Sequence, residues 1–330
     1  MINKDSTLEA KLSPRQKTLQ ILSNLRLLII LILIVIIFSL VNPGYISGNN
    51  LYVILMSISV LGLAAIGQTL CLITGGFDIS VGAIVLITSV TAAYMIKFLG
   101  VNIWLAFLIV LIEGAFIGSV NGFIITKMRV NPLITTLAMM TILTGASQIF
   151  TRGQTIVVNE ENFRFLGTYR IFGIKFFQIN IIIMVMMFIV FFIILGFTYY
   201  GKYIYAIGAN KDTAKFTGIN VDNILVSVYM LSGLLSALGG YILASRLGSA
   251  QPGIGGFFPL LTVAGSVLGG VSLSGGKGNT MGTLLGLLIL QSLNIGLIGL
   301  GLETFFQDIA SGLVLILAVF IDIYRKNKTI

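Results

Sequence analysis

Long apolar runs dominate this sequence, and they constrain its fold more than any other feature. Of its 330 residues, 57% are hydrophobic and only 9% are charged, whereas a soluble globular protein has about 25% charged residues. Too few charged side chains are present to cover a water-facing surface of this size. The sequence therefore predicts a polytopic membrane protein and leaves no room for a large soluble catalytic domain.

The apolar runs predict an all-α integral membrane protein with about ten transmembrane helices, since a helix needs about 20 residues to cross a bilayer. The membrane domain is predicted at 26–323, between a cytoplasmic N-terminal segment (1–25) and a cytoplasmic C-terminal tail (324–330). The first run is long and lacks a small-residue cleavage site, so it is not expected to be a removable signal. The predicted spans are 26–41, 51–73, 80–97, 103–126, 133–151, 179–199, 223–245, 257–273, 281–298 and 302–323.

The Lys and Arg residues predict the orientation, because they accumulate on the cytoplasmic side of membrane helices. With the N-terminus inside, fourteen of the 20 lie in cytoplasmic segments and six lie on the opposite side. This favours N-in and C-in, with 127–131, 200–222 and 275–279 inside and the loop 152–178 outside. No basic cluster is interleaved with aromatic residues outside the membrane, so nucleic-acid binding is not expected.

Several kinds of chemistry are not expected. The chain has no His and one Cys, Cys71, within an apolar run, so a disulfide framework and His-dependent zinc, haem or acid–base chemistry are not predicted. Lys277 follows a glycine as in a phosphate-binding loop, but Gly278 stands where that loop needs Ser or Thr. We therefore expect no catalytic residue, no metal site and no ATP hydrolysis in this chain.

The segment Thr74–Gly82 interrupts an apolar stretch. Gly75 and Gly76 are suited to end one helix, and Asp78 can accept backbone N–H groups to start the next. Asp78 could also face a solute or a partner, because a charge near the membrane is costly without a role. A similar segment, Gly269–Ser274, suggests two similar halves of parallel orientation.

Two sets of glycines repeat at four-residue steps, which places small residues on one helix face. Such faces let helices approach closely in lipid, and they also permit sliding of one helix along another. The two predicted helix-packing sets are Gly114, Gly118 and Gly122, and Gly278, Gly282 and Gly286.

Few polar side chains fall within the apolar runs, and they suit an uncharged polar solute. Each could instead join two helices, and Glu113 is expected to be protonated or paired because a mid-membrane carboxylate costs about 2.5–3.5 kcal/mol. With an aromatic ring for stacking, the candidates for the substrate path are Gln68, Phe77, Asp78, Glu113, Asn121, Gln291 and Asn294.

The inner loop 200–222 predicts a short helix, Lys211–Phe216, with Asn210 as its N-cap and Gly218 as its end. A short polar helix on the cytoplasmic face could contact a soluble partner. The predicted coupling residues are Asn210, Lys211, Asp212, Thr213, Ala214, Lys215, Phe216, Thr217, Gly218 and Ile219.

Four segments, in order and with matching spacing, resemble the membrane subunit of bacterial ABC importers of the ribose, xylose and galactose type. The resemblance extends over about 25–322. The segments are Gly67–Leu70 running into Gly75–Gly82; Lys202–Gly208 with Gly218–Val221; Ser249–Pro252; and Leu268–Gly270 with Ser274–Gly278.

The resemblance implies a permease in the bacterial plasma (inner) membrane that forms the translocation path for a monosaccharide such as ribose. It implies four kinds of partner besides membrane lipid: a cytoplasmic ATPase subunit that binds ATP and Mg, a second permease copy or close homologue, an external solute-binding protein, and the solute itself. In that picture 210–219 resembles the coupling helix. Two departures concern the solute path: Pro259-Leu260-Leu261 stands where the family often has Glu-Leu-Asp, and Glu113 replaces an apolar residue.

Three alternatives remain open at this point. The cargo could be a nucleoside or another furanose-like signal molecule, because an external binding protein usually selects it. A secondary transporter would need a titratable relay or a sodium site. Glu113 and Asp78 are the acidic side chains that could form one. A membrane transferase would need clustered acidic or His residues, and the sequence has no such cluster.

Overall fold

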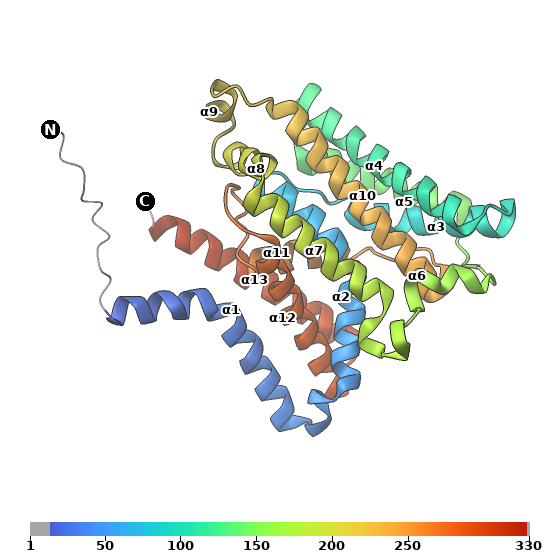
Figure 1. The fold of residues 1–330 in the computed structure, drawn as a ribbon, viewed down its shortest axis with the longest axis horizontal. Helices are drawn as coiled ribbons and strands as arrows, with labels where there is room; N and C mark the ends of the chain where they lie inside the picture. Colours follow the sequence, from blue (N-terminus) through green and yellow to red (C-terminus); the bar gives the residue numbers. More distant parts are fainter. Residues whose placement is uncertain (1–13, 329–330) are drawn as a thin grey trace.

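The computed structural model describes residues 14–328 as a bundle of helices (Figure 1). Residues 1–13 and 329–330, the ends of the two predicted terminal segments, lie outside this described range. The longer helices are α1 (Pro14–Val41), α2 (Gly48–Ile73), α3 (Val81–Leu99), α4 (Ile103–Lys127), α5 (Pro132–Thr151), α7 (Ile179–Phe197), α10 (Val221–Leu247), α11 (Phe258–Leu268), α12 (Thr280–Gly299) and α13 (Thr304–Lys328).

Short elements connect these helices at both ends of the bundle. They are the helices α6 (Phe165–Thr168), α8 (Tyr199–Ala209) and α9 (Lys211–Phe216), the 3₁₀ turns Pro43–Ile46, Glu161–Arg164, Ile171–Gly173 and Lys175–Phe177, and the strands β1 (Ile156–Val157) and β2 (Ser249–Ala250). The two strands pair antiparallel, with Ile156 opposite Ala250.

Seven helices in the described range are long and apolar enough to cross a membrane: α2, α3, α4, α5, α7, α10 and α12. The predicted all-α membrane fold is therefore present. The apolar part of α1, Leu25–Val41, and the whole of α11 are shorter.

Helix α11 is shorter than the apolar run that predicted it at 257–273. Its eleven residues rise about 16 Å, roughly half of the ~30 Å hydrocarbon layer. The helix ends where Gly269 lies against the backbone of Gly282 at the start of α12, and Gly270 follows with φ +94°. The apolar run continues to Leu273, so hydrophobicity alone could not mark this end.

Helix α10 lies at the centre of the bundle, packed against α4, α2 and α3. Figure 1 shows it running between α4 and α7. Most of α2, α3 and α10 is buried, whereas α4, α5 and α7 expose most of their residues. The three buried helices therefore form the core, and α4, α5 and α7 supply much of the outer surface, whereas α12 is about half buried.

The first predicted glycine face lies directly against α10. A Cβ at Gly114 would meet the carbonyl oxygen of Gly233, and a Cβ at Gly118 would meet that of Tyr229. At Gly122 the nearest atom would be the Cα of Val226, at 2.7 Å. Backbone lies against backbone along this contact, so a side chain fits at none of the three positions without moving a helix.

The two ends of α10 hold different structures. Its first turns pack against α9 through Leu225 and Ala214, and its last turns pack against α6, where Gly167 lies against Arg246. A helix of 27 residues is about 40 Å long. Helices α9 and α6 therefore lie at opposite ends of the bundle, as Figure 1 shows.

Replacing Gly118 by Ala is expected to destabilise the protein by about 1–3 kcal/mol, because the added methyl group overlaps the Tyr229 carbonyl and forces α4 and α10 apart. Gly196 on α7 is exposed, and no neighbouring atom lies within 4 Å of the place that an added methyl group would take. Gly196→Ala, at the next-to-last residue of α7, should therefore be neutral or slightly stabilising. Thermal unfolding in detergent micelles measures both. Equal effects of the two substitutions would contradict this account of the α4–α10 contact.

Candidate functional site

A buried network of hydrogen bonds surrounds the Asp78 carboxylate. One of its oxygens, Oδ1, accepts hydrogen bonds from the Ser80 backbone N–H at 3.0 Å and the Ser80 hydroxyl at 2.5 Å. The other oxygen, Oδ2, accepts from the Ser232 hydroxyl at 2.7 Å. The Asn121 amide donates to the Ser80 hydroxyl at 2.9 Å. Four residues from α4, α10 and the segment before α3 are thus joined, and all four are fully buried.

The segment between α2 and α3 brings Asp78 inside the bundle. Gly75 turns the chain with φ +77°, and Gly76 leaves room for the Tyr229 hydroxyl, which donates to the Phe77 carbonyl at 3.2 Å. Ser232, which binds Asp78, is eleven residues into α10, or about 16 Å along its axis. Helix α3 therefore begins deep within the bundle.

The contacts of Asp78 are those of a group that joins helices. Its carboxylate has no exposed surface, and its three hydrogen bonds all come from serines at the start of α3 and in α10. Asp78 accepts a hydrogen bond from the backbone N–H of Ser80, the N-cap residue of α3, and it adds a contact to α10. Its place on the substrate path stays a prediction. Phe77, beside it, is half-buried.

Two predicted amides are fully buried with unpaired polar atoms. Gln68 on α2 has no hydrogen-bond partner for either amide atom, and Asn121 has none for its Oδ1, within the part of the chain that the structure describes. The neighbours of Gln68 hold α2 in place: Gly67 lies against Ser232, and the Thr69 hydroxyl lies 2.7 Å from that of Thr283 on α12. Both amides therefore lie between packed helices.

Glu113 is separate from this network. It is half-buried on α4, and its Oε1 accepts a hydrogen bond from the Thr91 hydroxyl of α3 at 3.1 Å. Its Oε2 is buried without a partner in the described range. Glu113 therefore has a hydrogen-bond partner in the neutral hydroxyl of Thr91, and this bond links α4 to α3. That the carboxyl group is protonated stays a prediction.

The two candidates on α12 differ in their surroundings. Asn294 lines a cavity of about 300 Å³ between α11, α12 and α13. Gln291, one turn earlier, is 9% exposed and is not among the residues that line this cavity. The other lining residues are Phe257, Leu260, Leu261, Ala264, Gln307, Ser311 and Gly312. This cavity combines two amides, a hydroxyl and an aromatic ring, and the lining side chains that the structure describes carry no charge.

Glycines form a backbone junction where α2, α8 and the loop before α12 meet. The Gly276 N–H donates to the Ile73 carbonyl at 2.8 Å, and a Cβ at Gly208 would overlap both groups. The Tyr205 hydroxyl of α8 adds a hydrogen bond to the Gly278 carbonyl at 2.6 Å. The end of α2 and the 270–279 loop are thereby held directly against α8.

The second predicted glycine set is divided by the start of α12. Gly282 and Gly286 lie on the helix, where a Cβ would meet the carbonyl oxygens of Gly269 and Gly265. Gly278 precedes the N-cap Asn279, has φ +129°, and lies against Val271. Gly278 is thus a loop residue, and the helix face contains the other two.

The predicted short inner helix is present as α9, Lys211–Phe216. The Asn210 side chain accepts a hydrogen bond from the Thr213 N–H at 2.9 Å, and Gly218 ends the helix with φ +84°. Within it Ala214 is buried against the body of the protein, whereas Phe216 is 91% exposed. The free surface of 210–219 is therefore on the side of Phe216.

Sequence reasoning missed Ser232 and Tyr229, the two α10 residues that hold the segment containing Asp78. A signal was available for Ser232, because Ser232, Ser236 and Gly240 repeat the same four-residue step as the glycines of α4. Nothing in the sequence marked Tyr229. Among the side chains that the structure describes, no three His, Cys, Asp or Glu residues come together as metal ligands.

A bundle of apolar helices with an interior polar network and a backbone junction at one end is the fold of a polytopic membrane protein. The comparison with known proteins specifies the class: residues 50–319 match the family described as "Branched-chain amino acid transport system / permease component". The chain belongs to this family and is a multi-pass membrane permease.

The chain is also similar to individual sugar permeases. It is 40% identical to the ribose import permease protein RbsC of Haemophilus influenzae over 307 residues, 92% of this chain and 94% of that protein. It is 40% identical to RbsC of Bacillus subtilis over 90% of this chain and 91% of that one. The fructose import permease protein FrcC of Rhizobium meliloti is 34% identical over 89% and 84%, respectively. No solved structure matches the chain.

Replacing Ser232 by Ala should lower the free energy of unfolding by about 1.5–3 kcal/mol, because the Asp78 carboxylate loses a charge-assisted hydrogen bond. Ser236, one turn later on α10, is the matched control, since its hydroxyl is buried with no partner in the described range. Ser236→Ala should be neutral or stabilising. Thermal unfolding of both variants in detergent checks this, and a Ser232→Ala protein as stable as wild type would contradict the structural role of Asp78.

Proposed function

We propose that this chain is the permease subunit of an ATP-driven importer for a monosaccharide of the ribose type. The observation that carries the proposal is 40% identity to ribose import permeases over about nine-tenths of both chains. In this proposal a separate cytoplasmic ATPase subunit binds ATP and Mg, and an external solute-binding protein delivers the sugar. The membrane is the bacterial plasma membrane.

The proposed topology has ten spans, with both termini and α9 in the cytoplasm and the loop 152–178 outside. The fourteen-to-six distribution of Lys and Arg supports this orientation. The separation of α9 and α6 at opposite ends of α10 is consistent with it, because one end of the bundle then faces each side of the membrane.

The cavity beside Asn294 supports an uncharged, polyhydroxylated cargo. Amides donate and accept hydrogen bonds, which suits sugar hydroxyls, and Phe257 at the rim offers an apolar face for a sugar ring. The cavity volume of about 300 Å³ falls at the small end of the roughly 300–1,000 Å³ range of ligand pockets. In this proposal the cavity is part of the solute path, which a second copy of the permease completes.

Helix α9 is the proposed contact for the ATPase subunit. Its exposed surface centres on Phe216, and an exposed aromatic side chain of this kind is suited to a hydrophobic pocket in a partner. Ala214 packs inward against Ile207 and Leu225. A bulky substitution at Ala214 would therefore disturb folding. A substitution at Phe216 tests the contact with the ATPase without this effect, because that side chain is exposed.

Vesicles containing this chain with its ATPase and solute-binding protein are expected to accumulate labelled ribose when ATP is supplied, and to lose that uptake when the ATPase is omitted. Competition with fructose and with a nucleoside measures the range of cargo. Ribose uptake driven by a proton or sodium gradient without the ATPase would contradict the proposal and indicate a secondary transporter.

Phe216→Ala is expected to weaken association with the ATPase by about 2 kcal/mol or more, roughly 30-fold. The reason is that the exposed Phe216 ring is proposed to fill a hydrophobic pocket of the ATPase. Uptake should fall with it. Phe172→Ala is the matched control, since that side chain is 90% exposed in the loop 152–178 at the other end of the bundle. Co-purification of the ATPase with each variant is the measurement. Wild-type association of Phe216→Ala would exclude this face of α9.

A further inference from the structure

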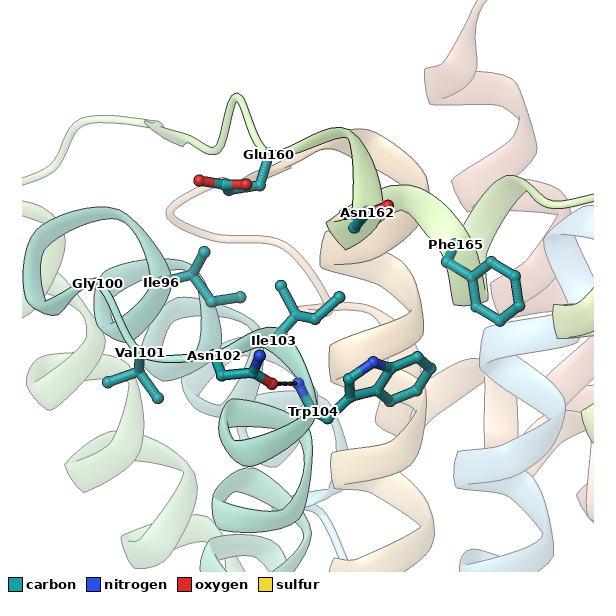
Figure 2. A pocket seen from close by; sticks show the side chains of 9 residues that line it. All are labelled: Ile96, Gly100, Val101, Asn102, Ile103, Trp104, Glu160, Asn162 and Phe165. Carbon is teal, nitrogen blue, oxygen red and sulfur yellow. Dashed lines mark hydrogen bonds between the residues drawn. The ribbon is translucent and has the colours of Figure 1, made fainter.

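Two hollows flank the end of α3 at the proposed outer face. The first, about 490 Å³, lies between the α3–α4 turn and the loop before α6, as Figure 2 shows. The second, about 710 Å³, lies between the ends of α3 and α5. Ile96 lines the first and Lys97 the second, so consecutive residues of one helix face the two hollows.

The hollows carry opposite charges. Glu160 is the charged residue lining the first, and Lys97 and Arg152 are those lining the second. Among the side chains that the structure describes, the salt bridge found joins Lys127 to Asp222 and involves none of these three groups. The Lys97 Nζ lies over the Phe98 ring, 5.4 Å from its centroid, but this contact does not neutralise it. All three charges are therefore available to a partner.

The first hollow has the surroundings that a cationic side chain requires. The Trp104 side chain is 48% exposed, and its ring is supported by the edge of Phe165, with ring centroids 6.0 Å apart. The Glu160 carboxylate lies on the opposite side of the hollow in Figure 2. A guanidinium or ammonium group placed there donates a charge-assisted hydrogen bond to the carboxylate and makes a cation–π contact with the indole.

The loop that carries Glu160 is held firmly against the body of the protein. The β1–β2 pairing fixes the chain before it. The Phe163 ring after it is buried beneath Tyr241, with centroids 5.5 Å apart, and the Ser245 hydroxyl donates to the Phe163 carbonyl at 2.6 Å. A hollow fixed in this way costs little ordering entropy when a partner binds.

We propose that the external solute-binding protein docks by inserting a Lys or Arg side chain between Trp104 and Glu160, while an acidic side chain of the same protein lies over Lys97 and Arg152. This rests on the proposed function, which supplies the partner and the outward orientation. Adjacent hollows of opposite charge fix the orientation of a docked protein, since a reversed partner would bring like charges together.

A protein fits these observations better than an anionic phospholipid headgroup such as that of phosphatidylglycerol. The phosphate of such a lipid would be attracted to Lys97 and Arg152, but the carboxylate of Glu160 would repel it. The polar rim of the first hollow, with Asn102 and Asn162 beside Glu160, is also suited to hydrogen bonds at a protein interface.

The test compares two adjacent carboxylates in the fully assembled importer, reconstituted in nanodiscs. Glu160→Gln should weaken binding of its purified, ribose-loaded solute-binding protein by about tenfold and flatten the salt dependence of the affinity. Glu161→Gln is the matched control, because Glu161 is exposed in the same turn but does not line the hollow. Trp104→Ala should weaken binding further when combined with Glu160→Gln.

The cationic hollow is tested in the same assay. Lys97→Gln should weaken docking severalfold in bilayers of phosphatidylcholine, whereas Lys175→Gln, which removes a cation of the loop 152–178 outside both hollows, should not. The ATP-saturated rate of uptake at high binding-protein concentration should remain near wild type for all these variants, since only the docking step is changed.

Three outcomes would overturn the inference. They are wild-type docking by Glu160→Gln, an equal loss for Glu161→Gln, and an effect of Lys97→Gln that requires phosphatidylglycerol in the bilayer, which would assign that hollow to lipid. If Trp104→Ala lowers only the yield of folded protein, the indole is a membrane-interface anchor and its part of the proposal is wrong. Failure of the wild-type importer to bind the solute-binding protein would instead contradict the proposed function.

Discussion

The backbone contact between α10 and its neighbours is the constraint on which the rest of the structure depends. Lipid tails are as apolar as helix side chains, so helices in a membrane associate through close packing and hydrogen bonds. Here the packing uses small residues: Gly118 lies against the Tyr229 carbonyl, Gly67 against Ser232, and Gly240 against Thr88. Helix α10 thereby fixes α4, α2 and α3 at once. Its first turns seat α9, its middle holds Asp78, and its last turns hold the loop that carries Glu160.

Features set by neighbouring residues were predictable from the sequence. The Asn210 cap, helix α9 and the turn at Gly218 are local, because each depends on contacts within a few residues. The apolar runs likewise predicted where most long helices lie. Local signals did not reveal where α11 ends, since that depends on the contact of Gly269 with Gly282 on another helix. The Asp78–Ser232 hydrogen bond, across 154 residues, also has no local signature.

Four amide side chains that the sequence could not distinguish differ in their burial. Gln68, Asn121, Gln291 and Asn294 are all amides within apolar runs, and composition gives them the same expected role. In the structure Gln68 and Asn121 are fully buried between helices, whereas Asn294 lines a cavity. The difference arises from which face of each helix turns inward, and neighbouring small residues such as Gly122 indicate that face only after their partner helix is known.

The glycine junction at the end of α2 has a mechanical consequence. Side chains between helices act as compliant spacers, because they can change rotamer and absorb a displacement. At Gly208 there is no such spacer, and backbone atoms of Ile73 and Gly276 lie directly against α8, which leads into α9 through Asn210. A displacement of α9 is therefore expected to move the end of α2 and the loop before α12 directly, because no side chain between the backbones can absorb it.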